Sequence, residues 1–202
     1  YIDVPLYDSQ VAWLANQNMN FLVGGTNPER MGTAHPNIVP YQTFATADRH
    51  LALAVGNNRQ FQACMRCLGL GDIAGSPKLH DNAARVQNRD ELIALMAAEF
   101  RKQGASVWLR EFAACGVPAG PINTIEDVFT EPYAKERELV KHVSRVDADD
   151  IPTVANPVRF SATPVSYRHA PPQLGQHTEE ILSQELGYSD EQIDALRRSG
   201  AI

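Results

Sequence analysis

The sequence predicts an α/β protein in two parts, and three observations carry that prediction. Residues from about 41 to 123 alternate strand-like runs with stretches of helical apolar spacing, the pattern of a compact α+β unit with its own core. An apolar helix precedes this unit, and nothing nearby in the sequence offers it a packing partner. After Leu139, short extended runs between proline-containing turns replace the helical spacing, as in a segment that wraps over another surface.

The composition is that of an ordinary globular protein, and it argues against several classes of partner. The 202 residues are 44% hydrophobic and 21% charged, with a net charge of −6 and no cluster of Lys and Arg. We therefore expect no nucleic-acid partner and no membrane partner, and no apolar run approaches a membrane span. Three cysteines, an odd number, argue against a disulfide framework. The expected compartment is reducing, which means the cytoplasm, or the mitochondrial matrix in a eukaryote.

The N-terminal residues look like the edge of an element whose partners lie upstream. The pattern predicts a short strand over Tyr1–Pro5 and an apolar helix over Leu6–Leu22 that ends before Gly24. Because the chain opens without an initiator Met, we expect a polypeptide that is entered partway through.

The stretch Gly24–Gln42 is the leading candidate for a functional segment. It contains three glycines and three prolines and has neither helical nor strand periodicity. Long connections of this kind inside a domain are usually binding loops or linkers. Arg30 and His35 are its residues best able to meet an anion or move a proton. Composition alone leaves two interpretations open, a rigid linker and a loop that lines a ligand site.

Local signals predict the next elements in order. Tyr41–Thr46 and Leu51–Val55 form a hairpin, and the turn at Gly56-Asn57-Asn58 opens a helix that runs through Leu68. Gly69–Pro77 is then a turn-rich break.

Two further helices and a strand complete this unit. Asn88 is predicted as the N-cap of a helix that runs to Gln103. A shorter helix begins at Ser106 and is stopped by Gly116. The segment Gly116–Ile122 is punctuated by prolines and is predicted to be extended, as a buried strand or a crossing segment.

Three helices are predicted in the remaining chain. The first spans Thr124–Glu138 and carries acidic residues in its first turn, which suits the helix dipole. The second spans Thr178–Leu186, with its first residue as the expected cap. Ser189 and Gln192 form a capping box for the third, Asp190–Ser199.

The familiar chemical motifs are weak or missing. Cys64 and Cys67 make a C-x-x-C inside a predicted helix, and no second pair completes a zinc site, so buried structural cysteines are favoured and no metal is expected. No P-loop, G-x-S-x-G or H-E-x-x-H pattern occurs. The histidines expected to face solvent are His50, His80, His142 and His169. The acidic run expected to be a solvated turn comprises Asp147, Asp149 and Asp150.

Four motifs, taken together and in this order, resemble a known family. They are Gly32-Thr33-Ala34-His35-Pro36-Asn37-Ile38-Val39-Pro40-Tyr41-Gln42, then Val55-Gly56-Asn57-Asn58-Arg59-Gln60-Phe61, then Gly116-Val117-Pro118-Ala119-Gly120-Pro121-Ile122-Asn123, and last Pro171-Pro172-Gln173-Leu174-Gly175-Gln176-His177-Thr178. The chain resembles the C-terminal half of a class III CoA-transferase, the CaiB/BaiF family that includes formyl-CoA and carnitine CoA-transferases. Within it, the branch acting on dicarboxylates such as succinate and hydroxymethylglutarate is the most similar.

The resemblance implies a domain organisation that the local patterns do not supply. Residues 1–24 would be a strand and helix of a Rossmann-like large domain, and residues 25–40 an active-site loop or linker. Residues 41–123 would form the small α+β domain. Residues 124–202 would return to pack on the large domain, with two subunits interlocked as a homodimer. The N-terminal half of the same protein would be a necessary partner.

The resemblance also implies a reaction. Family members move CoA from an acyl-CoA donor to a free carboxylic acid, through an aspartyl anhydride and an enzyme-bound thioester. The nucleophilic aspartate is expected upstream of residue 1, because Asp3 and Asp8 lie too far along the family pattern. No catalytic residue is therefore expected in this chain. The CoA thioester and a small carboxylate are substrates, and no cofactor is expected to be bound permanently.

The loop that covers the reacting acyl group in the family falls on Gly32, Thr33, Ala34 and His35, which are the candidate substrate-binding residues. This sequence departs from the all-glycine form of that loop in formyl-CoA transferase. Backbone N–H groups here could stabilise an oxyanion, and His35 could orient a carboxylate. Two alternatives stay open: an acyl-CoA racemase of the same fold, working by acid–base chemistry, and a non-catalytic binding or assembly fragment.

Overall fold

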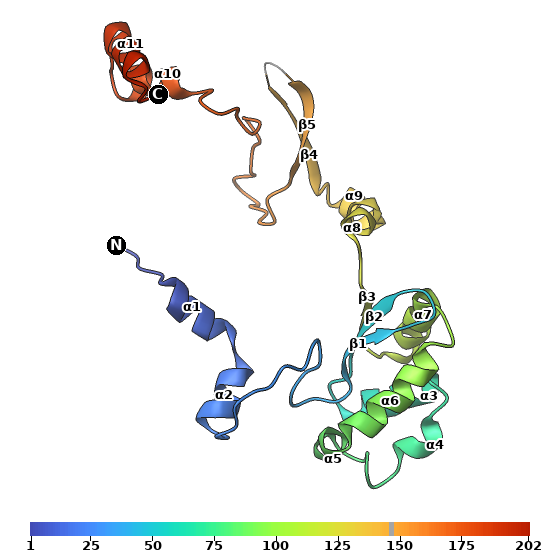
Figure 1. The fold of residues 1–202 in the computed structure, drawn as a ribbon. Coiled ribbons are helices and arrows are strands. Elements are labelled where there is room, and N and C mark those ends of the chain that lie inside the picture. The colour runs from blue at the N-terminus through green and yellow to red at the C-terminus, as the bar shows by residue number, and fades with distance from the viewer. Residues whose placement is uncertain (146–147) are drawn as a thin grey trace. The chain divides into compact units, whose positions relative to one another are not determined.

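The computed structural model describes residues 1–145 and 148–202. The chain divides into two units, Tyr1–Ile122 and Asn123–Ile202 (Figure 1). The main cluster of buried apolar side chains lies in the first unit, between residues 39 and 117.

A three-stranded antiparallel sheet anchors the first unit. β1 (Tyr41–Ala45) and β2 (His50–Ala54) form a hairpin, and β3 (Ala119–Pro121) pairs with β2, giving the order β1-β2-β3. Leu51 and Leu53 point to the core from alternate positions of β2, as the period of a strand requires. The predicted hairpin and the predicted third strand are confirmed, although β3 is half-buried and not fully buried.

Helices pack on this sheet, α6 against β1 and α7 against β2 and β3 (Figure 1). The helices that follow the hairpin in this unit are α3 (Asn58–Cys67), α4 (Gly71–Ala74), α5 (Asn82–Gln87), α6 (Arg89–Phe100) and α7 (Ala105–Cys115). The predictions at α3, α6 and α7 are confirmed, and Gly116 ends α7 with φ 67. The turn-rich break holds the short α4, which was not predicted, and neither was α5, whose N-cap Asp81 accepts a hydrogen bond from the Ala84 N–H at 2.8 Å.

Asn88 is the N-cap residue of α6, as predicted, but its side chain makes no capping hydrogen bond to that helix. Its Nδ2 donates instead to the carbonyl oxygens of Ala84, at 2.9 Å, and Lys78, at 3.2 Å. Asn88 therefore links α5 to the segment that precedes α5. The first turn of α6 carries Asp90 and Glu91, which suit the positive end of its dipole.

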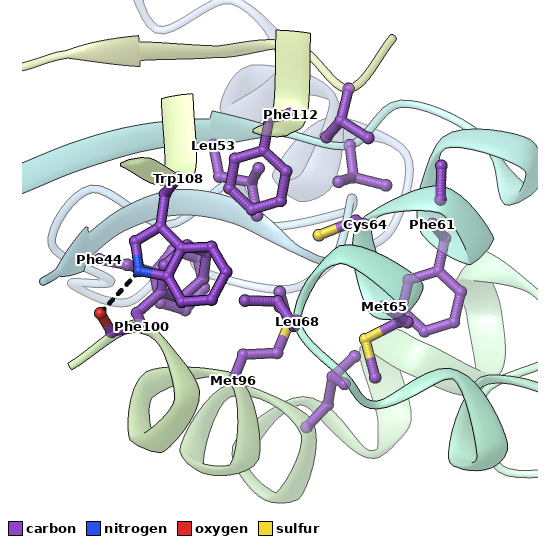
Figure 2. Close-up of a cluster of buried hydrophobic side chains, with 14 of the residues drawn as sticks. Phe44, Leu53, Phe61, Cys64, Met65, Leu68, Met96, Phe100, Trp108 and Phe112 are labelled. Carbon is purple, nitrogen blue, oxygen red and sulfur yellow. Dashed lines mark hydrogen bonds between the residues drawn. The ribbon is translucent and has the colours of Figure 1, made fainter. Parts of the chain in front are cut away.

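Aromatic rings from β1, α6 and α7 fill the centre of the core (Figure 2). Phe100 stacks on Phe44 with centroids 4.5 Å apart, and it meets Trp108 edge-on at 5.7 Å and Phe112 at 5.8 Å. The buried indole N–H of Trp108 donates to the Phe100 carbonyl oxygen at 2.9 Å, so burying this ring leaves no polar atom unpaired.

The β1–β2 turn also holds the start of α7. Asp48 Oδ1 accepts hydrogen bonds from the Thr46 hydroxyl (2.8 Å), the Arg49 N–H (2.9 Å) and the Ala105 N–H (2.8 Å). The bond from Ala105, followed by that from Thr46, lowers the pKa of the Asp48 carboxyl. A Cβ on Gly104 would lie 3.0 Å from Asp48 Oδ2, so a larger residue there would require the Asp48 carboxylate to shift by a few tenths of an ångström.

Asp48→Asn should reduce stability in a way that depends on pH. The folded-state pKa of Asp48 lies below the unfolded one, so the stabilisation from its charge is present above the unfolded pKa, near 3.8. It is lost as the pH falls from there through the folded pKa. We expect the variant to have a lower urea midpoint than the wild type at pH 7. The difference between the two midpoints should become smaller below about pH 4. A gap of constant size between pH 7 and pH 2.5 would contradict this account of the carboxylate.

The N-terminal segment departs from its prediction. Tyr1–Pro5 is not a strand, and the expected continuous helix is two helices, α1 (Leu6–Trp13) and α2 (Asn16–Leu22), broken where Ala15 takes φ 48. Neither helix buries a residue. The large apolar side chains left exposed on α1 and α2 are Leu6, Tyr7, Val11, Trp13, Met19, Phe21 and Leu22. Without tertiary packing, nothing holds the two helices in one line.

The second unit begins with two short helices where one was predicted over Thr124–Glu138. α8 (Ile125–Thr130) starts at a capping box between Thr124 and Asp127. Glu131 is extended, and Pro132 then opens α9 (Pro132–Glu136). Proline cannot continue a helix at this position, because it lacks the N–H that would bond to the previous turn.

Two of the predicted extended runs pair as an antiparallel hairpin of β4 (Val140–Arg145) and β5 (Ala148–Val154). Of the predicted acidic run, Asp147 and the side chain of Asp149 lie outside the described residues. Asp150 is exposed, with φ 64, and its carboxylate lies 2.6 Å from His142 Nδ1. The four histidines predicted to face solvent are all exposed.

The last helices are α10 (Thr178–Glu180), which continues as the π-helix η1 (Ile181–Glu185), and α11 (Asp190–Ser199). Both predicted helices are confirmed, as is the capping box at the start of α11. The N-cap position of α10 belongs to His177, so the prediction of Thr178 as the cap was wrong. Among the described residues, no helix is both long and apolar enough to cross a membrane.

Candidate functional site

The loop between α2 and β1 is held at several points along its second half. At its turn, Gly32 takes φ 61, and the Ala34 N–H donates to the Met31 carbonyl oxygen at 3.1 Å. The Thr33 hydroxyl accepts a hydrogen bond from the backbone N–H of Thr43 at 3.1 Å, and it lies 2.8 Å from the Thr43 hydroxyl. Of the candidate residues Gly32, Thr33 and Ala34, Thr33 is therefore bonded to β1 through Thr43, and Ala34 is bonded within the loop.

His35 is half-buried, and its ring has a defined orientation. Its backbone N–H donates to the Tyr41 carbonyl oxygen at 2.9 Å, and the two rings stack with centroids 5.3 Å apart and an angle of 25°. The Asn37 N–H donates to His35 Nδ1 at 3.1 Å. Because Nδ1 is an acceptor, the neutral ring carries its proton on Nε2. The Nε2–H is then the hydrogen-bond donor of this ring.

Arg89, the first residue of α6, holds the backbone of His35 in place. Its Nη2 donates to the carbonyl oxygens of His35, at 3.0 Å, and Pro36, at 2.6 Å. Its Nη1 is buried and has no hydrogen-bond partner among the described residues. One guanidinium thus holds two successive carbonyls of the loop from a residue 54 positions away.

Arg85 and Asn82 hold the following part of the loop. Asn82 donates from Nδ2 to the Asn37 carbonyl oxygen at 2.7 Å, and its Oδ1 accepts the Val39 N–H at 3.1 Å. Arg85 Nε donates to the Val39 carbonyl oxygen at 2.8 Å. With Arg89, these side chains bind the carbonyls of His35, Pro36, Asn37 and Val39, and we call Asn82, Arg85 and Arg89 the loop cradle.

Arg85 is the most deeply buried charge of the first unit, with 1% of its surface exposed. It stacks over the Phe61 ring at 4.4 Å and donates to the Leu79 carbonyl oxygen (3.1 Å) and to Asn58 Oδ1 (3.0 Å). Burial lowers its pKa, and the charge of Asp81 acts in the opposite direction. Hydrogen bonds to three oxygen atoms offset the desolvation of this cation.

A groove of about 780 Å³ lies between α2 and the loop. Met31, just before Gly32, and Pro36 and Asn37, just after His35, are part of its lining, while Gly32, Thr33, Ala34 and His35 are not. Asn37 Nδ2 also donates to Asn20 Oδ1 on α2 at 3.0 Å. The four predicted site residues therefore lie next to the lining of this groove and are not part of it.

Sequence reasoning missed the whole loop cradle. One signal was present: Arg89 falls in the first turn of a predicted helix, where a positive charge is disfavoured by the helix dipole. A cation at such a position needs a partner from elsewhere in the fold, and here the partners are loop carbonyls. The prediction of buried cysteines is confirmed for Cys64, whereas Cys67 is half-buried. The described residues contain no group of three or more His, Cys, Asp or Glu that could hold a metal ion.

The class of protein follows from a family comparison: the chain belongs to CoA-transferase family III, whose model matches residues 1–178. The succinyl-CoA:glutarate CoA-transferase of Mus musculus is 39% identical over 202 residues, which are 100% of this chain and 46% of that protein. The succinate–glutarate CoA-transferase of Agrobacterium fabrum is 41% identical over 184 residues, 91% of this chain and 46% of that protein.

Solved structures agree with this assignment. The crystal structure of a CAIB/BAIF family protein from Brucella suis matches with a TM-score of 0.72 at 39% identity, over 91% of this chain and 47% of that one. The predicted family resemblance and the α/β fold that it implied are thus confirmed. The chain spans about half the length of these relatives.

Replacing Arg85 with Met should destabilise the first unit strongly. The substitution keeps the apolar stem but leaves the oxygens of Val39, Leu79 and Asn58 without a charged donor, at a cost of roughly 3 kcal/mol or more. Urea unfolding followed by tryptophan fluorescence measures it. The matched control is Arg59→Met at an exposed position of α3, which should change stability little. Equal losses of stability in the two variants would show that the buried hydrogen bonds of Arg85 do not stabilise the first unit.

Proposed function

We propose that this chain is the C-terminal part of a CoA-transferase that moves CoA from an acyl-CoA donor to a free carboxylic acid. The observation that carries the proposal is identity of about 40% to named CoA-transferases along 91–100% of this chain but only 46% of theirs. The aspartate that would form the anhydride with the acyl group is expected in the half that precedes residue 1. This chain would supply the small domain and the loop that meets the substrate.

A dicarboxylate acceptor fits this proposal best. The two relatives reported above are named for succinate or succinyl-CoA and glutarate. A dicarboxylic acid offers one carboxylate for reaction and a second for recognition, so its site needs hydrogen-bond donors at two places. We propose succinyl-CoA as donor and a short dicarboxylate such as glutarate as acceptor.

The proposed role of the loop is to orient one hydrogen-bond donor, on the neutral ring of His35, toward the reacting carboxyl group. The Nε2–H of His35 would donate to an oxygen of the bound carboxylate or of the anhydride. Arg89 and Tyr41 would act as positioning residues, because they hold the backbone and the ring of His35. The backbone N–H groups of Gly32–Ala34 would lie beside the same substrate, as the family resemblance implies.

The proposed domain division follows the same resemblance. Residues 25–40 would be the active-site loop and 41–123 the small domain, while 1–24 and 124–202 would pack on a large domain. Support comes from the exposed apolar side chains of α1 and α2, such as Trp13 at 84% and Leu6 at 89%, which need another surface. An interlocked homodimer would supply part of that surface.

The first experiment tests the activity itself. The complete protein is incubated with succinyl-CoA and a panel of mono- and dicarboxylates, and new CoA thioesters are measured by chromatography. We expect CoA exchange with dicarboxylates of four to six carbons. Absence of exchange with every acid would contradict the proposal, and inversion of a chiral 2-methylacyl-CoA would point to the racemase instead.

A second experiment tests His35 in that complete protein. His35→Ala removes the Nε2–H donor, and loss of one donor to a developing oxyanion typically costs roughly 100-fold in kcat. His35→Gln, which keeps a side-chain N–H, should recover part of the activity. The control is His50→Ala, an exposed histidine of the same unit. Full activity of His35→Ala would remove His35 from the site while leaving the transferase assignment intact.

A further inference from the structure

Two cysteines that are far apart in the sequence meet at the surface of the first unit. Cys67 is the last residue of α3 and Cys115 the last residue of α7, and these two helices pack against each other. Their sulfur atoms lie in direct contact, 2.8 Å apart, although 48 positions separate the residues. Both are free thiols.

The third cysteine differs from this pair. Cys64 has no exposed surface, and burial raises the pKa of its thiol well above the ordinary range. Cys115 is exposed and Cys67 half-buried. A reagent from solution can therefore reach the contact through Cys115, and it cannot reach Cys64 without opening the core.

We propose that Cys67 and Cys115 form a reversible oxidation site that takes a low-molecular-weight disulfide, such as glutathione disulfide, as its oxidant. The proposal is independent of the transferase function. It adds a modification site to a chain whose odd cysteine count argues against a permanent disulfide framework.

The chemistry has two balanced steps. In the first, the thiolate of Cys115 attacks one sulfur of the small disulfide, forms a mixed disulfide and releases one small thiolate. In the second, Cys67 Sγ, already in contact, attacks the Cys115 sulfur and releases the second small thiolate. The two protons lost from the cysteines are taken up by the two released thiolates. The cysteines are oxidised, and the small disulfide is reduced to two thiols.

The surroundings of Cys67 set the order of these steps. Burial raises the pKa of Cys67 to about 12, the neighbouring Cys115 and Glu111 act in the same direction, and Arg66 opposes them. Since only the thiolate attacks a disulfide, Cys67 is a poor first nucleophile at neutral pH. It acts as the resolving cysteine, where contact with the target sulfur compensates for its low thiolate fraction.

The site lies at the far end of α3 from the loop cradle. Asn58, the first residue of α3, accepts the hydrogen bond from Arg85, and Cys67 is its last. Ten residues of α-helix span about 15 Å. Oxidation here would fasten the C-terminal ends of α3 and α7 without touching the residues that hold His35.

The products can be distinguished because trypsin places each cysteine on its own peptide. Cleavage after Lys and Arg gives residues 60–66 with Cys64, residues 67–78 with Cys67 and residues 111–135 with Cys115. The complete folded protein is treated with glutathione disulfide, quenched with an alkylating reagent in acid, digested and analysed by mass spectrometry.

We expect a cross-link between peptides 67–78 and 111–135 that disappears on reduction with dithiothreitol. The Cys115→Ser variant should lose the cross-link, and Cys67→Ser should accumulate a stable glutathione adduct on peptide 111–135. The matched control, Cys64→Ala, should form the cross-link as the wild type does. Cross-linking also closes a long loop of the unfolded chain, so the oxidised protein should unfold several degrees higher.

Three results would overturn the proposal. The first is a glutathione adduct on Cys115 that persists in the wild type without forming a cross-link. The second is a cross-link of peptide 67–78 to peptide 60–66 in place of 111–135. The third is a cross-link that forms only after the protein is unfolded in urea. All three are independent of whether CoA transfer is observed.

Discussion

The arrangement of the first unit depends on one buried arginine, Arg85, and one half-buried arginine, Arg89, that donate to the carbonyl oxygens of an irregular loop. This segment, rich in proline and glycine, pairs only part of its backbone within itself, and its remaining carbonyl oxygens need other donors. Arg85 and Arg89 supply them, three of the four carbonyls being reached by their guanidinium groups. The dependence is mutual, because an arginine with 1% exposure is tolerable only while its acceptors are in place. Loop and helices therefore fold as one structure.

This constraint divides the loop into two parts. From Gly32 onward, hydrogen bonds to β1, α5 and α6 define the backbone. Before Met31, the described contacts come chiefly from α2, whose own surface is exposed. Under the proposed function, the second part would present His35 from a fixed platform, and any adjustment to substrate would fall on the first part. This differs from a loop that moves freely as a whole, and it agrees with the departure from an all-glycine sequence.

What the sequence predicted well is what local chemistry decides. The β1–β2 hairpin, α3 and α7 follow from apolar periodicity, and the capping box at Ser189 follows from two side chains three positions apart. Pro132, inside the predicted helix Thr124–Glu138, was a local signal of a helix break that the prediction did not use. The break at Ala15 had no such warning, since neither glycine nor proline is present there. The two helices on either side of it bury no residue.

The candidate site was only half predictable, for a physical reason. The loop and His35 stand out by composition, but the side chains that hold the loop backbone come from residues 43 to 54 positions away. No periodicity links Arg89 to His35, and a cation at the start of a helix is unfavourable until the fold supplies its partners. The family resemblance supplied the expected role of the loop without this support. The cradle became visible only in three dimensions.

The orientation of His35 limits what the loop can do chemically. With Nδ1 accepting the Asn37 N–H, the neutral ring offers its Nε2–H as a donor. A neutral donor suits a carboxylate that must remain reactive, because a fixed cation would stabilise the free anion as much as the reacting state. Under the proposed mechanism, the group that attacks the thioester would come from a segment that precedes residue 1. The part left to this chain is to hold one hydrogen-bond donor still.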